Sequence, residues 1–437
     1  MVGNGAREHA IAEAICKSKA DLYAFMSAKN PGIARLSRDY MIGDTCDPKA
    51  VAKYAKDSKI NLAVIGPENP LEVGVVDALE NAGIDCAGPS AIAAQIETNK
   101  SFARNLMKEH RIRGCPVFKV FDNPKEIDDF IDDLSVDVAV KPAGLTGGKG
   151  VKIMGEHLKD KEEAKAYAKE ILEKKIGTIN EVVIEEKLLG EEFTLQAFVS
   201  PDELLGMPMV QDHKRAYEGD KGPNTGGMGS YSDRNYVLPF LTQEDYQFGL
   251  SIMRDTVKAL KDETGEIYKG FLYGQFIVTQ NGPKLIEFNA RLGDPEAMNT
   301  LPIMEGDFVE VLKAMAHGGL EKADVKFQEK ATVCKYLVPK GYPAKPTKGE
   351  EIEVNENAIE KSGARIYYAS VDEKNGKILT SSSRAIAITG IANTIEKAER
   401  IAEEATQYVS GPLEHREDIG TNELIQKRFD RMKEIRG

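Results

Sequence analysis

The sequence predicts a multidomain fold that combines α/β and α+β units. Short apolar runs alternate with helical patterns from residue 1 to about residue 87, which is typical of a parallel sheet covered by helices. From about residue 331 the pattern changes to short strands followed by a helix, which indicates a separate α+β unit. The length of 437 residues allows roughly two to four domains with cores of their own.

Composition narrows the class of protein and its compartment. Hydrophobic residues make up 41% of the chain and charged residues 29%, as in an ordinary soluble globular protein. The net charge of −12 argues against general nucleic-acid binding, although local donors could still hold small anions. Five scattered cysteines without a CxxC pair favour a reducing compartment and no structural zinc. With no membrane-length apolar run and no signal-peptide pattern, we expect a cytoplasmic protein.

The N-terminal unit has the alternation of a parallel sheet. The expected strands are Leu22–Met26 and Leu62–Ile65. The expected helices are Glu8–Lys19, Pro48–Lys56 and Leu71–Ala82. Ligands of such sheets bind at the carboxyl ends of the strands. The loops expected there are Gly3-Asn4-Gly5, Asn30-Pro31-Gly32 and Gly66-Pro67-Glu68.

The first glycine loop differs from a dinucleotide-binding fingerprint. Gly3 and Gly5 are followed by Glu8 where a third glycine would stand, which argues against NAD. A phosphate at the N-terminus of the following helix remains an alternative. Only Met1 and Val2 precede the loop, which suggests that the numbering begins inside the first strand.

A glycine-rich loop forms the next feature. We expect one long helix over Ser90–His110, capped by Ser90 and carrying Lys100, and then a strand over Val136–Val140. The loop from Lys141 to Gly150 follows, and it lacks the first glycine and the Ser or Thr of a Walker A motif. We interpret it as a flap whose backbone amides cover polyphosphate, with a plain hairpin loop as the alternative.

Acidic residues surround the next strand–turn–strand unit. A charged helix is expected at Lys159–Lys174, and an apolar strand then runs into a Glu-rich turn before strand Phe193–Val199. The turn could lie along the edge of a nucleotide base, with backbone groups of Glu186 and Leu188 at the base. Glu185 or Glu192 would then meet ribose hydroxyls.

A long polar loop covers residues 211–231. It reads Gln-Asp-His-Lys-Arg at Gln211–Arg215 and is rich in glycine at Gly222–Tyr231. Long loops without secondary structure are usually binding elements or disordered, and the interleaved charges favour binding. For His213, a structural hydrogen bond is a better interpretation than a general base.

The strand at residues 285–289 is the expected metal site. A hairpin is predicted from Phe271–Val278 and Lys284–Phe288, and Glu287 and Asn289 point to one face because strand side chains alternate. Hard oxygen ligands beside Arg291 suit Mg²⁺ bound to phosphates, whereas a surface salt bridge is the plainer alternative. Gln275 on the partner strand could add a third oxygen ligand.

The C-terminal unit completes the pattern. The expected strands are Ala331–Val338, Glu350–Val354, Ala364–Ser370, Ile378–Ser381 and Ala385–Thr389. A helix at Thr394–Tyr408 is expected to follow them.

Taken together, these motifs resemble the ATP-grasp superfamily and, within it, the glycinamide ribonucleotide synthetase family. The matching stretches span nearly the whole chain: GNGAREHA at Gly3–Ala10, GPENPL at Gly66–Leu71, Gly88–Ser90, Gln95–Phe102, Lys141–Val151, Val183–Glu192, QDHKR at Gln211–Arg215, Gly222–Tyr231 and EFNARLGDPE at Glu287–Glu296. The combination of QDHKR, GPNTGGMG and EFNARLGDPE is highly specific. Departures are the short first strand, Ala6 in place of a further glycine, and Gln275 where many relatives have a small residue.

The resemblance implies a fold and a reaction. It implies a preATP-grasp domain at residues 1–100, a two-part ATP-grasp domain at 101–325 with a flap subdomain at about 120–188, and a small C-terminal domain at 326–437. It implies that ATP, glycine and 5-phosphoribosylamine give ADP, phosphate and glycinamide ribonucleotide, with Mg²⁺ or Mn²⁺, in a monomer or weak homo-oligomer.

The resemblance also implies roles for individual residues. The catalytic candidates are Arg291, Lys214 and Asp212, and the metal candidates are Glu287, Asn289 and Gln275. The ATP candidates are Lys100, Lys141, Gly147, Gly148, Lys149, Gly150, Glu185, Glu186, Leu188 and Glu192. The substrate candidates are Gly3, Gly5, Gly66, Glu68, Asn224, Thr225, Gly226, Gly227 and Asp294.

Two alternatives stand beside this interpretation. One is another ATP-grasp ligase of purine synthesis, such as the aminoimidazole ribonucleotide carboxylating enzyme or the formate-dependent transformylase. QDHKR together with GPNTGGMG argues against it. The other is a catalytically inactive nucleotide-binding or scaffold protein, against which the intact set of Glu287, Asn289, Arg291 and Lys141 speaks.

Overall fold

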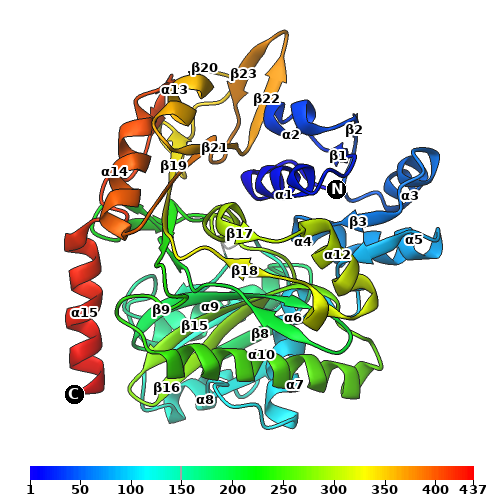
Figure 1. The fold of residues 1–437 in the computed structure, drawn as a ribbon. Helices are drawn as coiled ribbons and strands as arrows, with labels where there is room; N and C mark the ends of the chain where they lie inside the picture. Colours follow the sequence, from blue (N-terminus) through cyan, green and yellow to red (C-terminus); the bar gives the residue numbers. More distant parts are fainter. Residues whose placement is uncertain (148–149) are drawn as a thin grey trace.

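The computed structural model describes residues 1–147 and 150–437. Figure 1 shows an N-terminal unit in blue, a central unit from cyan to green and a C-terminal unit from yellow to red. Predicted Gly148 and Lys149 lie outside the described residues. Within the part of the chain that the structure describes, no helix has both the length and the apolar character needed to cross a membrane.

The N-terminal unit is the expected parallel sheet with helices. Its elements are α1 (Ala6–Lys17), β1 (Tyr23–Met26), α2 (Pro31–Leu36), β2 (Asp39–Ile42), α3 (Pro48–Asp57), β3 (Leu62–Val64), α4 (Glu68–Glu72), α5 (Val75–Asn81) and β4 (Asp85–Ala87). β1 pairs with β2 and β3 with β4, both in parallel. Val2 bridges Phe25 and Ile65 in parallel, so this one residue joins the two strand pairs.

Two predicted helices are interrupted. The helix expected at Leu71–Ala82 divides into α4 and α5 because Gly74 has a left-handed backbone. The prediction of one continuous helix over Ser90–His110 is wrong. This segment divides into α6 (Gln95–Thr98) and α7 (Lys100–Glu109) at Asn99, whose side chain caps α7 by accepting from the backbone N–H of Phe102 at 3.0 Å.

The central unit contains two antiparallel sheets. The smaller part comprises β5 (Phe118–Phe121), α8 (Ile127–Asp133), β6 (Val138–Pro142), β7 (Lys152–Ile153), α9 (Lys161–Lys174) and β8 (Val182–Glu186), in the order β5-β8-β6-β7. Its buried side chains form a core of their own. The larger part has β9 (Glu191–Val199), β10 (Leu204–Gly206), α10 (Gln243–Thr264), β15 (Gly270–Thr279) and β16 (Gly282–Asn289), in the order β10-β9-β15-β16. The predicted hairpin of β15 and β16 is confirmed.

The polar loop at residues 211–231 is more ordered than expected. It contains β11 (Gln211–Asp212), β12 (Arg215–Tyr217), β13 (Lys221–Asn224) and β14 (Gly229–Ser232). β12 and β13 form a two-stranded hairpin, whereas β11 and β14 join the sheet of the C-terminal unit. The order of that sheet is β11-β14-β19-β24-β21, in which the last three strands are β19 (Ala331–Pro339), β24 (Ile386–Ala392) and β21 (Arg365–Tyr368). The prediction of a loop without secondary structure is therefore wrong, because a strand from the C-terminal unit pairs with β14.

The C-terminal unit is the expected α+β unit with additional elements. The segment before it contains α11 (Ala297–Thr300), a 3-10 turn (Leu301–Ile303), β17 (Met304–Glu305), α12 (Phe308–His317), a second 3-10 turn (Leu320–Lys322) and β18 (Lys326–Phe327). The unit itself comprises β19 (Ala331–Pro339), β20 (Glu351–Val354), α13 (Glu356–Lys361), β21 (Arg365–Tyr368), β22 (Val371–Lys374), β23 (Lys377–Thr380), β24 (Ile386–Ala392), α14 (Ile395–Thr406), β25 (Val409–Ser410), β26 (Leu413–Glu414) and α15 (Asn422–Arg436). α15, in red in Figure 1, contacts β9 of the central unit.

Candidate active site

The predicted metal strand presents two oxygen-bearing side chains on one face. On β16, Glu287 and Asn289 are partly exposed, whereas Phe288 between them is buried in the core. Glu287 pairs with Gln275 across the hairpin, and Asn289 pairs with Tyr273. Carboxylate and amide oxygens on a rigid strand are a donor set that suits a hard divalent cation.

Lys214 reaches this face from the polar loop. Its ammonium lies 3.8 Å from Glu287 Oε1 and also donates a hydrogen bond to Gln275 Oε1. Burial opposes ionisation of Glu287, yet nearby cations, first Lys214 and then Lys100, Lys141 and Arg291, hold its pKa below the usual range. Glu287 is therefore an ionised carboxylate in a cationic surrounding.

Gln275 is engaged at both ends of its amide. Its Oε1 accepts from Lys214, and its Nε2 donates to Glu192 Oε2 at 2.6 Å. The side chain is also almost fully buried. This arrangement argues against the predicted role of Gln275 as a metal ligand, because its only oxygen already accepts from an ammonium group.

Lys141 is held by a buried carboxylate at the end of β6. Glu185 Oε2 accepts from Lys141 Nζ at 2.7 Å, and Glu185 also forms a two-point ion pair with Arg104 of α7 at 2.6 and 3.2 Å. Burial alone would raise the pKa of Glu185, but Arg104 and Lys141 lower it to about 2. Arg104 has no place in the motifs that we singled out, because its partner lies 81 residues away in the sequence.

This network changes the role expected for Glu185. Only 3% of its side chain is exposed, and both of its oxygens are bonded to cations. Such burial argues against a contact with ribose hydroxyls. Glu192 is exposed and remains the better candidate for that contact.

Lys100 joins the same cluster from the N-terminus of α7. Its Nζ donates to the backbone oxygen of Gly144 at 3.3 Å, at the start of the glycine-rich loop. Burial lowers the pKa of Lys100, and Lys141 lowers it further, whereas Glu287 acts in the opposite direction. Three lysines from three segments thus surround Glu287.

The ends of the glycine-rich loop are well defined. Gly147 has a left-handed backbone with φ of 59°, which favours glycine. The carbonyl oxygen of Gly150 accepts from Tyr167 of α9 at 2.7 Å, and the Gly150 amide donates to Thr146 Oγ1 at 3.3 Å. These contacts fix the base of the predicted flap.

The expected base-edge turn follows β8. The side chain of Glu186 accepts from Lys284 at 2.5 Å and from the backbone N–H of Val117 at 2.9 Å. Leu188 is partly exposed. The Glu186 carboxylate is thereby engaged, and a contact between the backbone of this turn and a nucleotide base stays a prediction.

Arg291 links the N-terminal and central units. Its guanidinium lies 3.2 Å from Glu68 and 2.9 Å from Glu97, and Glu97 also accepts from the backbone N–H of Ala290 at 2.6 Å. Burial raises the pKa of Glu97 to about 7 despite this partner, whereas Arg291 and Arg7 offset burial and lower the pKa of Glu68 to about 2. The donors of Arg291 are thus largely committed to carboxylates of the N-terminal unit.

The predicted substrate glycines of the N-terminal unit enclose Glu8. A Cβ atom at Gly66 would lie 2.1 Å from Glu8 Oε1, and one at Gly5 or Gly3 would lie 2.7 or 2.8 Å from atoms of the Glu8 side chain. Glu8 is 2% exposed and accepts from the backbone N–H of Gly5 and from Arg7, both at 2.5 Å. Because this carboxylate already lies at the N-terminus of α1, the structure argues against a phosphate resting there.

Asp294 lies where three segments meet. Tyr336 of β19 donates to Asp294 Oδ1 at 2.5 Å, and Arg384 lies 3.2 Å from the same oxygen. Arg384 also donates to the carbonyl oxygens of Gly226 and Gly227 at 2.5 and 3.0 Å. The C-terminal unit therefore supplies two side chains to the predicted substrate loops, and sequence reasoning missed both.

Asp212 lies beside the same loop. A Cβ atom at Gly227 would be 2.6 Å from Asp212 Oδ1, and the φ of Gly227 is 103°, so glycine is required there. Burial and the nearby Glu296 raise the pKa of Asp212. Thr225 closes the loop by donating from its N–H and hydroxyl to the carbonyl oxygen of Lys214 at 2.7 and 2.8 Å. Its neighbour Asn224 is exposed at the end of β13.

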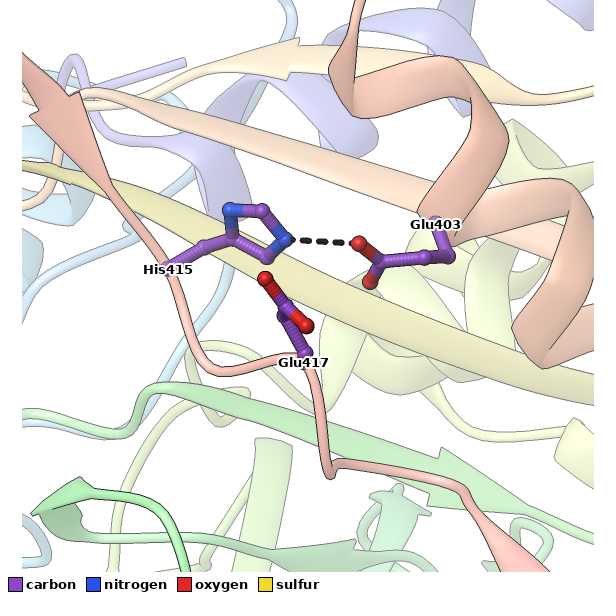
Figure 2. Close-up of side chains that lie close together, drawn as sticks. All are labelled: Glu403, His415 and Glu417. Atoms are coloured by element: carbon purple, nitrogen blue, oxygen red, sulfur yellow. Dashed lines mark hydrogen bonds and ion pairs between the residues drawn. The ribbon is translucent and has the colours of Figure 1, made fainter.

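A second group of metal-type side chains lies in the C-terminal unit. Figure 2 shows Glu403 of α14, His415 and Glu417, with His415 Nε2 lying 3.0 Å from Glu403 Oε1. The buried ammonium of Lys335 donates to Glu403 at 2.5 Å and to the carbonyl oxygen of Glu417 at 2.8 Å. We interpret the group as a structural ion network, because Lys335 already supplies the positive charge that a metal ion would bring.

Comparison with known proteins agrees with this arrangement. Sequence models of the N domain, the ATP-grasp (A) domain and the C domain of phosphoribosylglycinamide synthetase match residues 1–97, 98–297 and 332–422. The chain belongs to the phosphoribosylglycinamide synthetase family. This is the glycinamide ribonucleotide synthetase family predicted from the sequence, and the prediction of an ATP-grasp ligase is confirmed.

Individual relatives cover the whole chain. A phosphoribosylamine–glycine ligase of Methanocaldococcus jannaschii is 55% identical over 441 residues, covering 100% of this chain and 99% of the relative. The ligase of the same name from Methanosarcina barkeri is 55% identical over 439 residues, with the same coverage. The crystal structure of the phosphoribosylamine–glycine ligase of Thermotoga maritima superposes with a TM-score of 0.80 at 29% identity, covering 95% of this chain and 98% of that one.

Membership of this family has chemical consequences for the site. ATP-grasp ligases use ATP together with a divalent metal ion. The choice between Mg²⁺ and Mn²⁺, the domain limits and the role of each site residue remain predictions.

Proposed function

We propose that this chain joins glycine to 5-phospho-D-ribosylamine at the expense of ATP, giving glycinamide ribonucleotide, ADP and phosphate. This reaction is the second step of de novo purine synthesis. The observation that carries the proposal is the position of two lysines at β16: Lys214 Nζ lies 3.8 Å from Glu287 Oε1, and Lys141 Nζ donates to the carbonyl oxygen of the neighbouring Ile286 at 3.3 Å. The proposal is also supported by the 55% identity, over the full length of this chain, to a phosphoribosylamine–glycine ligase.

The chemistry explains why such a cluster is needed. A carboxylate is a poor electrophile, so one carboxylate oxygen of glycine must first be converted into a better leaving group. Transfer of the γ-phosphoryl group of ATP to the glycine carboxylate gives glycyl phosphate and ADP. The ribosylamine nitrogen then attacks the carbonyl carbon, phosphate leaves, and the nitrogen loses a proton. This route needs positioning and charge neutralisation rather than a protein nucleophile.

The residues around Glu287 divide this work. Glu287 and Asn289 would hold a divalent cation, Mg²⁺ or Mn²⁺, which would neutralise charge on the transferred phosphoryl group. Lys214 faces the same position and would stabilise developing negative charge. Lys141 and Lys100 would hold the remaining phosphates, with Glu185 fixing Lys141 in place. Arg291 adds positive potential at Glu287 while its donors hold Glu68 and Glu97.

The opposite side of the site would hold the two substrates. We assign the glycine and ribosylamine contacts to Asp294 and to the loop carrying Asn224–Gly227, with Glu68 on the N-terminal side. Arg384 and Tyr336 support this assignment because they fix Asp294 and the loop relative to one another. The flap over residues 147–150 would exclude water, since an acyl phosphate hydrolyses readily.

Composition supports a proposal on the compartment and the oligomeric state of the enzyme. A net charge of −12 and five free cysteines are consistent with a cytoplasmic enzyme that acts as a monomer or weak homo-oligomer. Sedimentation velocity over a range of concentrations would measure the assembly directly.

Dependence of ADP release on each substrate tests the proposed reaction. The protein is incubated with ATP, Mg²⁺ and glycine, with and without freshly prepared phosphoribosylamine. Parallel incubations replace glycine by formate or bicarbonate with their own ribonucleotide partners. We expect sustained ADP release and a glycinamide product only with glycine and phosphoribosylamine together. Release with formate or bicarbonate instead, or with none of the mixtures, would overturn the proposal.

A further inference from the structure

The hairpin of β12 and β13 has little support from a core of its own. Most of its side chains are exposed, and the two strands form an isolated two-stranded sheet. Such a hairpin is only marginally stable by itself in water. Its two ends nevertheless meet at the site, since Thr225 after β13 donates twice to the carbonyl oxygen of Lys214 before β12. Any movement of the hairpin is therefore passed to Lys214.

The tip of the hairpin is bound by the segment that precedes α15. Gly219 and Asp220 have φ of 70° and 59°, so the turn uses two consecutive left-handed residues. The N–H of Gly219 donates to Asp418 Oδ2 at 2.8 Å. Asp418 in turn accepts from Arg416 at 2.8 and 2.7 Å, so the tip is attached to a rigid ion pair.

The carboxylate of Asp220 lies between two arginines and a histidine. Arg416 lies 3.1 Å from Asp220 Oδ1, Arg428 of α15 donates to Asp220 Oδ2, and His213 Nδ1 lies 3.4 Å from Oδ1. Arg416 is 1% exposed and also donates to the carbonyl oxygen of Arg215 in β12 at 3.0 Å. Burial opposes ionisation of Asp220, but His213, Arg428 and Arg416 hold its pKa far below the usual range.

We propose that Arg416 and Arg428 are positioning residues that hold the β12–β13 hairpin through Asp220 and thereby keep Lys214 against Gln275 and Glu287. The proposal rests on the proposed role of Lys214 at the transferred phosphoryl group. Arg416 and Arg428 then influence the reaction through the position of Lys214.

α15 offers a matched pair of arginines for the test. Arg428 contacts both Asp220 and Glu191, whereas Arg431 lies one turn further on and pairs with Glu191 at 3.2 Å. Arg428→Met removes the contact with the hairpin. Arg431→Met removes an ion pair from the same helix and the same glutamate and leaves the hairpin contact intact.

Steady-state kinetics measure the effect on catalysis. For Arg428→Met we expect kcat of ligation to fall roughly ten- to hundredfold with KM for ATP nearly unchanged, because misplacement of a catalytic group affects the transition state. Arg431→Met should stay within about twofold of the parent enzyme. Arg428→Lys should restore part of kcat, since it keeps the charge but not the planar fork. Equal effects of Arg428→Met and Arg431→Met would overturn the proposal.

The nearly isosteric variant Asp220→Asn provides a second test without a change of size. If the arginine acts through Asp220, the double variant Asp220→Asn/Arg428→Met should lose no more kcat than the single variants. Additive losses would contradict the mechanism. Circular dichroism and thermal unfolding establish that each variant is folded at the assay temperature.

Hydrogen–deuterium exchange gives a readout that does not depend on the reaction. We expect faster exchange across residues 213–227 in Arg428→Met and Asp220→Asn, and unchanged exchange there in Arg431→Met. Unchanged exchange in all three variants would overturn the proposal even if activity fell. A parent enzyme that releases no ADP with glycine and phosphoribosylamine would count against the proposed function, while the exchange result would still decide the anchoring of the hairpin.

Discussion

Two glutamates near Lys141, Glu185 and Glu287, have different surroundings, and we therefore propose different roles for them. The Glu185 side chain is 3% exposed and forms ion pairs with Arg104 and Lys141, so it holds Lys141 in place. The Glu287 side chain is 34% exposed, and Lys214 Nζ lies 3.8 Å from its Oε1. Glu287 is thus open to a ligand, and Glu185 is closed to one.

Replacement of Glu287 tests the metal assignment. We expect Glu287→Ala to lower the rate of ADP formation by about three orders of magnitude or more, because a metal-holding carboxylate stabilises the transferring phosphoryl group. The fold should be retained, since the side chain is partly exposed. ADP formation is measured with a coupled assay, with Glu353→Ala on an exposed face of β20 as the control. Substantial activity in Glu287→Ala would remove Glu287 from the metal role.

Replacement of Glu185 tests the holding of Lys141. Glu185→Gln leaves Arg104 and Lys141 without their buried counter-charge, so we expect KM for ATP to rise and the free energy of unfolding to fall by about 3 kcal/mol. Initial rates at varied ATP and urea denaturation measure the two effects. Asp128→Asn, which breaks the more exposed pair with Lys169, serves as the control. An unchanged KM for ATP would separate Glu185 from the nucleotide site.

At the scale of elements, the break between α6 and α7 places two functional side chains. Asn99 ends one helix and caps the next, so Lys100 lies in the first turn of α7 and Arg104 one turn later. A single continuous helix would direct Lys100 differently relative to Gly144 and Lys141. The interruption is therefore part of the site, although the helical pattern runs through it.

Removal of this cap gives an element-scale prediction. Asn99→Ala should lower the free energy of unfolding by about 1 kcal/mol, as expected for loss of an N-cap. It should also raise KM for ATP, because the first turn of α7, which carries Lys100, is then no longer fixed by the cap. Asp160→Ala removes the equivalent cap of α9, where the Asp160 side chain accepts from the backbone N–H of Glu163 at 3.1 Å. It should cost similar stability and leave KM for ATP unchanged. Identical kinetics for the two variants would show that the cap is only structural.

At the scale of the whole molecule, buried ion pairs make the free energy of unfolding depend on pH. The pKa of Glu185 and that of Glu68 are about 2 in the folded protein, against an ordinary value of 4.5. A carboxyl group with a lowered pKa contributes stability above its unfolded pKa and loses that contribution as the pH falls through the folded pKa. Both groups therefore stabilise the fold above about pH 4.5 and cease to do so between about pH 4.5 and 2.

Urea denaturation at a series of pH values measures this dependence. We expect the free energy of unfolding to fall as the pH is lowered through this window, with a shallower fall in Glu185→Gln because glutamine does not titrate. Glu97, whose pKa is raised to about 7, acts in the opposite sense and weakens the fold as the pH rises toward neutrality. A slope that is the same in both proteins would contradict the assigned role of Glu185.

Most elements of the fold were predictable from local patterns. The parallel N-terminal unit, the β15–β16 hairpin and the main C-terminal strands follow from apolar alternation and turn residues. The β12–β13 hairpin was missed because its strands are exposed and lack an apolar face. α15 was missed because only Leu424, Ile425 and Met432 of its residues are buried, which is too few for a clear helical stripe.

The sequence by itself determined the family, the expected ligase chemistry and the strand that presents Glu287 and Asn289. Motifs and strand alternation are local, so they can be recognised without the fold. Only the tertiary structure decided which charged groups are free and which are engaged. Lys141 meets Glu185 across 44 residues of sequence, Arg384 meets Gly226 across 158, and Arg428 meets Asp220 across 208. Such partners are brought together by folding, because the energy of a buried charge depends on neighbours that the local sequence does not contain.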